Sequence, residues 1–468
     1  MVNIARLRIH VVKIPKLFSA IPVILLSGLL APQMHAAIIF TNLVSFEETN
    51  GASPEAALIQ GKDGNLYGTT FSGGPGDFLN NGTVFQLTPS GAFTNLIAFD
   101  GTNGGPRAGL VQGIDGNFYG TTYAGGTNTA GTVFELTTNS ALTTLVTFAF
   151  DDNNGTYPIA GLTQSHDGSF YGTTAFGGTN NYGTIFRLAP TGTFVSVLSF
   201  DYADGASPYA APVQANDGDL YGTTYQGGTN GFGTIYKLTT NGTFNSLYSF
   251  TGGSDGGNPY AGLVQGRDGN FYGTTFYGGS NGNNGTVFEF SSSGALTTLL
   301  SFDGTNGANP QGGLLQASDG NFYGTTFSGG DSGYGTIFRL ATNGVLTTLI
   351  SFDGTNGAAP EAGLMQSADG NFYGTTTHGG TNGFGTVFRL GVIVPPPKFQ
   401  TVTRAGPTLT LNWSATVGQN YQMLYKTNLS QGAWSNLNNS VTATNPTMTT
   451  FDTTGPDRQR FYRILLLP

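Results

Sequence analysis

The stretch "DGNFYGTTY" at residues 115–123 returns almost unchanged along the chain. It appears as "DGNFYGTTF" at 268–276 and 319–327, and as "DGNFYGTTT" at 369–377. The tyrosine of its "YGTT" core occurs seven times, at intervals of 50 to 52 residues: Tyr67, Tyr119, Tyr171, Tyr221, Tyr272, Tyr323 and Tyr373. A repeat of this period is typical of solenoids, propellers and arrays, so it decides the fold class.

One copy of the repeat predicts four short strands. In the copy that begins at Pro310, the stretches "GGLLQ", "NFYGTTF", "GTIFRL" and "VLTTLISF" are rich in β-branched, aromatic and leucine residues, and turn formers bound each one. The Asp-Gly pair between the first two strands predicts a type I′ turn, in which both central residues have positive φ. Seven four-stranded antiparallel sheets of this kind predict an all-β protein, a seven-bladed β-propeller.

The two ends of the repeat region share one repeat between them. The last copy runs through "GTVFRL" at 385–390 and lacks a fourth strand before "GVIVPPPKF". The stretch "IIFTNLVSF" at 38–46 matches the fourth strand "GVLTTLISF" at 344–352. We therefore expect the N-terminal strand to close the last blade, because closure removes exposed sheet edges; an open solenoid is the alternative.

Composition divides the chain into four segments. Residues 1–36 hold four basic residues followed by "LFSAIPVILLSGLLA" and predict a secretory signal peptide, with a retained signal anchor as the alternative. The propeller would occupy 37–391, and "VIVPPPK" at 392–398 is a stiff linker. Short strand-like stretches at 399–468 predict a small β-sandwich of immunoglobulin or fibronectin-III type, an attachment-type domain with both tryptophans in its core.

Charge and composition narrow the possible partners. Residues 37–391 hold 7 basic and 24 acidic side chains, a net charge of −17, which disfavours nucleic acid and suits neutral or cationic partners. The chain has no cysteine, which excludes disulfides and thiolate chemistry. No apolar run of the mature chain is long enough to span a membrane. We expect a secreted protein, extracellular or at the cell surface, and a monomer.

The sequence contains no motif that is specific for a metal site. The Asp-Gly aspartates and the "DGTNG" loops offer oxygen ligands, so calcium is an open alternative to no cofactor at all. However, an aspartate before glycine is also what a tight turn requires, since its side chain bonds local backbone amides.

The unit "DGNFYGTT…GG…GTVFxL" resembles the GloVer-type tandem repeat of secreted bacterial proteins, which are described as choice-of-anchor proteins. The resemblance covers about residues 38–391, and it implies secretion and surface association without an established activity. The C-terminal pattern "YQMLYKTNL…W…FYRI" is similar to small domains that end many such proteins. Glycine doublets after the second strand are similar to kelch blades, but the kelch tryptophan is missing from every repeat.

Candidate site residues follow the proline that opens each first strand. This post-proline residue varies while its frame stays constant, and its seven versions are Glu55, Arg107, Ile159, Tyr209, Tyr260, Gln311 and Glu361. The long loops fall on the same face, so we expect these residues around the mouth of the central channel. The predicted ligand-binding residues are Glu55, Arg107, Tyr209, Tyr260, Gln311 and Glu361. The two tyrosines would stack on a sugar, and the Glu and Gln side chains would bond its hydroxyls.

Three functions fit these residues. The first is a non-catalytic binding or adhesion module for an extracellular glycan or protein. The second is a propeller-type polysaccharide-active enzyme, a glycosidase or lyase, with Glu55 and Glu361 as the acid–base pair because ring closure makes them neighbours. The third is an architectural surface repeat. No catalytic residue is assigned, since no Ser–His–Asp set suggests itself and no histidine recurs in the repeat.

Overall fold

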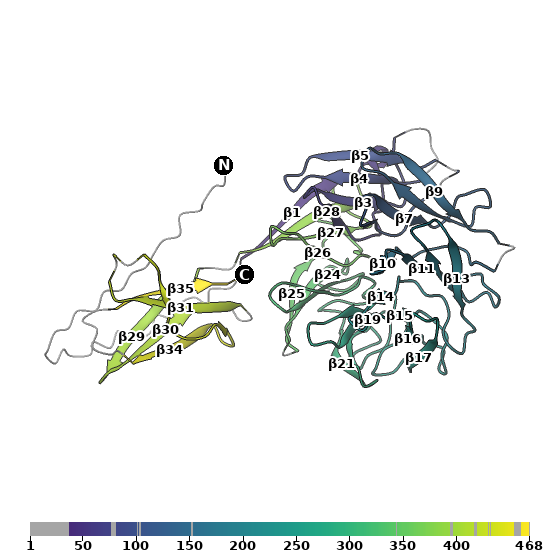
Figure 1. Cartoon of the computed structure of the whole chain (residues 1–468). Coiled ribbons are helices and arrows are strands. Elements are labelled where there is room, and N and C mark those ends of the chain that lie inside the picture. Colours follow the sequence, from purple (N-terminus) through teal and green to yellow (C-terminus); the bar gives the residue numbers. More distant parts are fainter. Residues whose placement is uncertain are drawn as a thin grey trace. The chain divides into compact units, whose positions relative to one another are not determined.

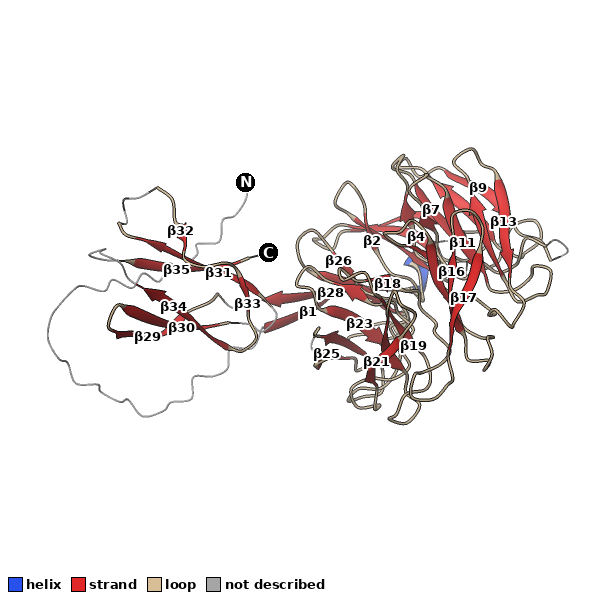
Figure 2. Ribbon diagram, turned by 60° about the horizontal axis from the view of Figure 1, so that its bottom comes forward, coloured by secondary structure: helices blue, strands red, loops and turns tan. Residues whose placement is uncertain are grey.

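The computed structural model describes residues 37–467 except 76–80, 101, 103, 151–152, 343, 394–395, 416–418, 429, 431 and 454–459. The predicted signal peptide at 1–36 lies outside the described residues. The chain divides into two compact units. The larger unit contains Phe40–Ala317 and Phe322–Gly391, and the smaller unit contains Val392–Pro468. Strands dominate both units, and Figure 2 shows one short helix, η1 (Glu48–Asn50).

The larger unit consists of four-stranded antiparallel sheets that follow one another around a centre, as the blades of a β-propeller do (Figure 1). Its described residues form seven such sheets, six of them from consecutive strands. These six are β2 (Ile59–Gln60), β3 (Leu66–Thr70), β4 (Thr83–Leu87) and β5 (Phe93–Ala98); β6 (Val111–Gln112), β7 (Phe118–Thr122), β8 (Thr132–Leu136) and β9 (Leu142–Thr147); β10 (Thr163–Gln164), β11 (Phe170–Thr174), β12 (Thr184–Leu188) and β13 (Phe194–Ser199); β14 (Val213–Gln214), β15 (Leu220–Thr224), β16 (Thr234–Leu238) and β17 (Phe244–Ser249); β18 (Val264–Gln265), β19 (Phe271–Thr275), β20 (Thr286–Phe290) and β21 (Leu296–Ser301); β22 (Leu315–Gln316), β23 (Phe322–Thr326), β24 (Thr336–Leu340) and β25 (Leu346–Ser351).

The remaining sheet of the larger unit joins both ends of the repeat region. Its strand order is β1 (Ala37–Ser45), β28 (Thr386–Ile393), β27 (Phe372–Thr376) and β26 (Met365–Gln366). Phe40 of β1 stacks on Phe388 of β28, with ring centroids 5.3 Å apart. This is the pairing that the split repeat predicts.

The two threonines of "YGTT" hold each sheet together and bind it to the next. The hydroxyl of Thr121 donates to the Ala160 carbonyl of the following repeat at 2.8 Å, and Thr122 bonds Thr132 within its own sheet at 2.7 Å. Thr375 donates to the Ala56 carbonyl at 3.0 Å, so the last repeat is bonded to the first. Bonds of the first kind also start from Thr69, Thr173, Thr223, Thr274 and Thr325. Every sheet is thus linked to the next by a buried hydroxyl with a partner.

The tyrosine and the aspartate of the repeat are structural as well. The Tyr119 hydroxyl donates to Asp115 Oδ2 at 2.7 Å, and its ring lies 4.2 Å from the Phe170 ring of the next repeat. Burial, together with Asp115, raises the pKa of Tyr119. Asp115 also accepts the Asn117 backbone N–H at 3.1 Å, so this aspartate caps the turn.

The turn after the first strand differs from the predicted type I′ turn. In the Asp115–Gly116 pair only Gly116 has a positive φ, of 92°. The Gly116 N–H donates to the Gly113 carbonyl at 2.9 Å, and the Gly113 N–H donates to the Asn117 carbonyl at 2.8 Å. The type I′ prediction is wrong because the loop contains three residues, a type I turn closed by a left-handed glycine, instead of two.

The innermost strands are shorter than the five-residue stretch "GGLLQ" predicts. Only Leu315 and Gln316 pair with β23, at Tyr323 and Phe322. The residues before them, 311–313, line the central pocket described below, where they have no strand partner.

One buried tyrosine departs from the repeat. Tyr236 on β16 is fully buried and its hydroxyl has no hydrogen-bond partner among the described residues. The matching positions hold phenylalanine: Phe85, Phe134, Phe186, Phe288, Phe338 and Phe388. Removing an unsatisfied buried hydroxyl relieves its desolvation penalty, so Tyr236→Phe is expected to raise the free energy of unfolding by about 1–3 kcal/mol.

Urea unfolding followed by circular dichroism measures this effect. Phe186→Tyr is the matched control, and it should lower the free energy of unfolding by a similar amount. An unchanged or earlier urea midpoint for Tyr236→Phe would show that its hydroxyl is already satisfied.

The smaller unit contains two antiparallel sheets that share one core. The first holds β29 (Phe399–Ala405), β30 (Thr408–Ser414) and β34 (Thr447–Thr453), and the second holds β31 (Asn420–Lys426), β32 (Ser435–Asn436), β33 (Val441–Thr442) and β35 (Phe461–Leu466). Trp413 and Tyr421 from the two sheets pack together in the core. The prediction that both tryptophans lie in the core is wrong for the second one. Trp434 is half-buried under the Lys426 ammonium and lies outside the core.

Candidate functional site

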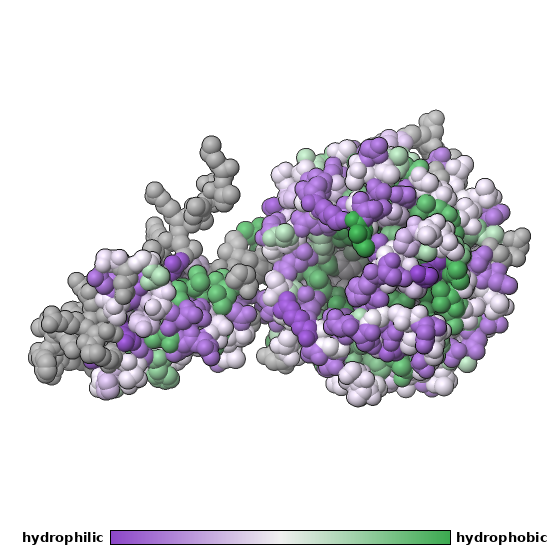
Figure 3. Space-filling model, in the orientation of Figure 1, coloured by the Kyte–Doolittle hydropathy of each residue, from purple (hydrophilic) through white to green (hydrophobic). Residues whose placement is uncertain are grey.

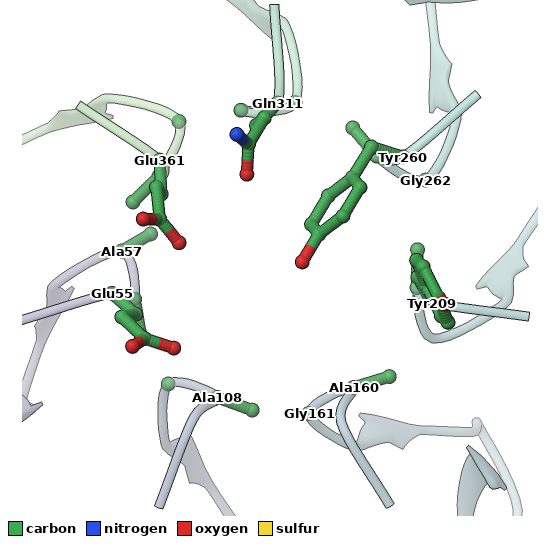
Figure 4. A pocket seen from close by; sticks show the side chains of 18 of the residues that line it. Glu55, Ala57, Ala108, Ala160, Gly161, Tyr209, Tyr260, Gly262, Gln311 and Glu361 are labelled. Carbon is green, nitrogen blue, oxygen red and sulfur yellow. The ribbon is translucent and has the colours of Figure 1, made fainter. Parts of the chain in front are cut away.

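The seven post-proline residues converge on one pocket of the larger unit. The pocket has a volume of about 240 Å³ and is lined by three consecutive residues from each of the seven repeats. All six predicted ligand-binding residues line it, together with Ile159. Figure 4 shows the carboxylates of Glu55 and Glu361 side by side, with the Gln311 amide and the Tyr260 hydroxyl turned toward the same space.

Alanine and glycine form the rest of the lining. Two such residues follow each varied residue, as in Glu55-Ala56-Ala57 and Glu361-Ala362-Gly363. Successive repeats approach so closely that a Cβ at Gly109 would lie 2.8 Å from the Ala57 carbonyl oxygen. The chemistry of the pocket therefore resides in the seven varied side chains, which a common backbone presents.

A residue with positive φ stands before the proline and fixes that backbone. Ser53 has φ 52°; its N–H donates to the Phe384 carbonyl and its own carbonyl accepts the Phe71 N–H, both at 3.0 Å. Five equivalent residues have φ between 53° and 57°: Tyr157, Ser207, Asn258, Asn309 and Ala359. This conformation costs a non-glycine residue about 1–2 kcal/mol, and hydrogen bonds on both sides hold it in place. The varied side chains are thus preorganised.

Arg107 is packed into the pocket wall. Its Cζ lies 4.6 Å from the centroid of the Phe71 ring and 4.7 Å from that of Tyr123, and its Nε lies 3.5 Å from Glu55 Oε2. The Glu55 side chain is 13% exposed and that of Arg107 is 32% exposed. Cation–π contacts on both rings hold the guanidinium next to the glutamate, where it offsets part of the carboxylate charge.

Burial shifts the titration of both glutamates. It raises the pKa of Glu55 to about 7; Arg107 opposes the rise and Glu361 adds to it. Burial also raises the pKa of Glu361, while Thr377 and Arg107 act in the opposite direction. The two neighbouring carboxyl groups therefore do not carry two full negative charges at neutral pH.

Tyrosines form another side of the pocket. Tyr209 stacks on Tyr225 with ring centroids 4.9 Å apart, and it meets Tyr260 edge to face at 5.1 Å. Because Tyr225 covers one face of Tyr209, a ligand can stack at most on the other face. Burial and the charge of Glu361 raise the pKa of Tyr260 to about 12, so its hydroxyl stays neutral and can donate or accept a hydrogen bond.

Sequence reasoning missed a second layer of varied residues. They follow "YGTT" directly, and they are Phe71, Tyr123, Ala175, Tyr225, Phe276, Phe327 and Thr377. Members of this layer hold Arg107, stack on Tyr209 and adjoin Glu361. The signal was available, since this position holds four residue types in the seven repeats while the four residues before it are constant.

The aspartates that were candidates for calcium binding serve as turn caps. Asp303 Oδ1 accepts the backbone N–H groups of Thr305 and Asn306, each at 2.9 Å, as a turn cap does. Within the described ranges, no group of three or more histidine, aspartate or glutamate side chains is placed to hold a metal ion. The described residues also include no helix that is long and apolar enough to cross a membrane.

Solved structures similar to this chain have low sequence identity to it. The BP39L lectin from Burkholderia pseudomallei has a TM-score of 0.47 at 9% identity, covering 82% of this chain and 96% of its own. A putative 6-phosphogluconolactonase from Bacteroides fragilis has a TM-score of 0.45 at 17% identity, covering 83% and 98%. An α-L-arabinanase from Penicillium chrysogenum has a TM-score of 0.41 at 14% identity, covering 76% and 98%. No curated protein matches the chain.

A family match covers most of the sequence. The Gloeobacter/Verrucomicrobia repeat matches residues 33–216 and 208–438, which together include every "YGTT" and all residues of the pocket. The resemblance that the "DGNFYGTT" unit indicates is therefore confirmed for the repeat region. The chain belongs to the Gloeobacter/Verrucomicrobia repeat family.

Proposed function

We propose that the larger unit is a closed seven-bladed β-propeller that binds one unit of an extracellular glycan in its central pocket, without catalysis. The observation that carries this proposal is the convergence of seven side chains of five types, from one repeat position, on a pocket otherwise lined by alanine and glycine. In a purely architectural repeat, we would not expect this position to vary while the residues around it stay constant. Small-molecule pockets measure roughly 300–1,000 Å³, and about 240 Å³ suits a single sugar ring.

The closed ring is supported by contacts between the last repeat and the first. The Thr375 hydroxyl bonds the Ala56 carbonyl at 3.0 Å, and the Ala368 N–H bonds Gln60 Oε1 at 2.9 Å. The matching bonds elsewhere join consecutive repeats, such as Thr121 to Ala160. The seven sheets are then seven blades, with β1 as the fourth strand of the last.

The side chains in the pocket suit a sugar. The Gln311 amide, the Tyr260 hydroxyl and the glutamates offer both donors and acceptors for sugar hydroxyls (Figure 4). The face of Tyr209 that Tyr225 does not cover would offer an apolar surface for the sugar ring.

Exposed aromatic residues extend this site. Tyr182, Phe232, Tyr334 and Phe384 share one repeat position between the second and third strands and are 38–49% exposed; we call them the outer aromatic set. The backbone carbonyl of each of these residues accepts an N–H from the segment that leads into a pocket residue. The donor lies two positions before the pocket residue, which is Tyr209 for Tyr182, Tyr260 for Phe232, Glu361 for Tyr334 and Glu55 for Phe384. Figure 3 shows hydrophobic residues gathered around the hollow of the larger unit, among hydrophilic ones. Further sugar units of a chain would stack on this set.

A second candidate function is a glycosidase or lyase. The rise in the pKa of Glu55 to about 7, beside Glu361, favours it, because a general acid must be protonated at neutral pH. Release of reducing ends from polysaccharides by the wild type, abolished in Glu55→Gln, would establish this function instead of simple binding.

The proposal also covers location and attachment. Residues 1–36 would direct secretion as a signal peptide, the mature monomer would reside outside the cell or at its surface, and 392–398 would be the linker. The smaller unit would be an attachment-type β-sandwich, a reading that its two sheets around one core support.

A glycan array on the chain from Ala37 tests the proposal. We expect binding to at least one glycan, and a loss of about tenfold or more in Tyr209→Ala/Tyr260→Ala, because aromatic contact area and a hydrogen bond are removed together. Phe384→Ala should weaken binding of oligosaccharides and leave binding of the single sugar unchanged. Tyr260→Phe, which keeps the ring, controls for folding. A folded wild type that binds no glycan would overturn the proposal.

A further inference from the structure

The two carboxyl groups of the pocket have unequal partners. Glu55 lies 3.5 Å from Arg107 Nε. For Glu361, by contrast, no lysine, arginine or histidine nitrogen of the described residues lies within 4.0 Å. Its carboxylate is half-buried and points into the pocket (Figure 4). A half-buried carboxylate without a close cation favours a cationic partner from outside.

The groups around Glu361 add hydrogen-bond acceptors. Gln311 and Tyr260 turn their polar atoms toward the same space, and each can accept a bond (Figure 4). Thr377, beside Glu361, is 3% exposed, and the hydrogen bond from its hydroxyl to the carboxylate lowers the pKa of Glu361. The pocket therefore holds an excess of acceptors around one carboxylate. An ammonium group, which has three donors and no acceptor, is the complement of such a site.

The aromatic side of the pocket and the net charge of the larger unit also favour a cationic ligand. Tyr260 and Tyr209 bring ring faces and edges next to the acceptors, and a ligand cation is attracted to such faces. Residues 37–391 carry a net charge of −17, which raises the local concentration of small cations. Arg107, the one cation of the pocket lining, is held between Phe71 and Tyr123.

We propose that the sugar bound in this pocket carries a free, protonated amine, and that its ammonium group binds between Glu361 and Tyr260. The ligand class is thus an amino sugar that is not acetylated. This inference rests on the proposed glycan-binding function and narrows it.

Titration calorimetry with a matched pair of ligands tests the inference. The probes are the β-1,4-linked glucosamine trimer and its fully N-acetylated form, which differ in the charge of the amino group. We expect the amine form to bind at least about tenfold more tightly, the lower end of what a charge-assisted hydrogen bond contributes. Glu361→Gln should remove this preference, so that the two trimers bind this variant with affinities within about threefold of each other.

A second variant separates the pocket from the general charge of the protein. Asp331→Asn removes one exposed negative charge outside the pocket and should keep the preference for the amine. Equal affinity of wild type for both trimers would overturn the amine inference while leaving glycan binding intact. If the wild type binds neither trimer nor any array glycan, both proposals fall. Loss of the preference in Asp331→Asn to the same extent as in Glu361→Gln would also overturn the inference.

Proton release gives an independent readout. The charged and titratable groups that face Glu55 are Arg107, Glu361 and the neutral Tyr260 hydroxyl, and a bound ammonium would join them. Since an added positive charge favours the ionised carboxylate, binding at pH 7 should expel part of the proton that Glu55 holds. Calorimetry in two buffers of different ionisation enthalpy should detect this release, and Glu55→Gln should abolish it. Identical proton release in Glu55→Gln and wild type would contradict the placement of the ammonium beside this pair.

Discussion

Replacing Phe46 with alanine is expected to lower the free energy of unfolding by about 3–5 kcal/mol, the range for a large aromatic residue removed from a core. Phe46 follows the N-terminal strand β1 and is 0% exposed. Its ring lies 5.5 Å from Phe85 and 5.9 Å from Phe93, both in the first repeat, and its N–H donates to the Gly385 carbonyl of the last repeat at 2.9 Å. The side chain therefore joins the two ends of the repeat region.

Phe250→Ala is the matched control for this experiment. Phe250 occupies the same repeat position, is 0% exposed, and lies 5.3 Å from Phe288 of the next repeat. If the ring is closed by β1, guanidinium unfolding should show equal losses for the two variants. A loss below about 1 kcal/mol for Phe46→Ala, beside a full loss for Phe250→Ala, would reject the closed ring.

Gly335→Ala is expected to lower the free energy of unfolding by about 2–5 kcal/mol, since a left-handed alanine costs about 1–2 and overpacking about 1–3 kcal/mol. Gly335 has φ 96°, and a Cβ there would lie 2.3 Å from the Thr326 carbonyl oxygen and 2.8 Å from Cδ of Pro360. The proline belongs to the next repeat and precedes Glu361. The glycine thus lets the segment that presents a pocket residue approach the preceding sheet.

Gly333 provides the control in the same loop. It has φ 80°, and a Cβ there would meet no heavy atom within 4 Å. Gly333→Ala should therefore show the conformational cost alone, about 1–2 kcal/mol. Equal effects of the two substitutions on the midpoint of chemical unfolding would mean that the contact with Pro360 relaxes freely.

Much of the fold could be predicted because each repeat contains the bonds that define it. The strands and the positions of the turns follow from local patterns in a stretch such as 310–357, and the split repeat follows when the two ends of the repeat region are compared with that stretch. Errors arose where local patterns are ambiguous. An Asp-Gly pair serves a three-residue loop as well as a two-residue one, and Trp434 carries no sign of which face of its sheet is covered.

The sequence predicted which residues line the pocket, but it did not predict how their side chains contact one another. The post-proline position stood out because it varies inside a constant frame, and all its members line one pocket. The pairing of Arg107 with Glu55 rather than Glu361, and the cover of Tyr225 on Tyr209, were not predictable. These contacts join residues 52 and 16 positions apart, and side-chain packing selects them.

By itself, the sequence determined the repeat, the four-stranded sheet, the split last repeat and the acidic charge of the larger unit. These properties depend on residue types and on their spacing within a repeat of about 50 residues, and that repeat occurs seven times in the chain. Only the tertiary structure decided that Glu361 has no cation within 4.0 Å among the described residues, and that burial raises the pKa of Glu55 to about 7. Those properties arise from desolvation and from charges that seven different repeats bring to one point, and no single repeat contains them.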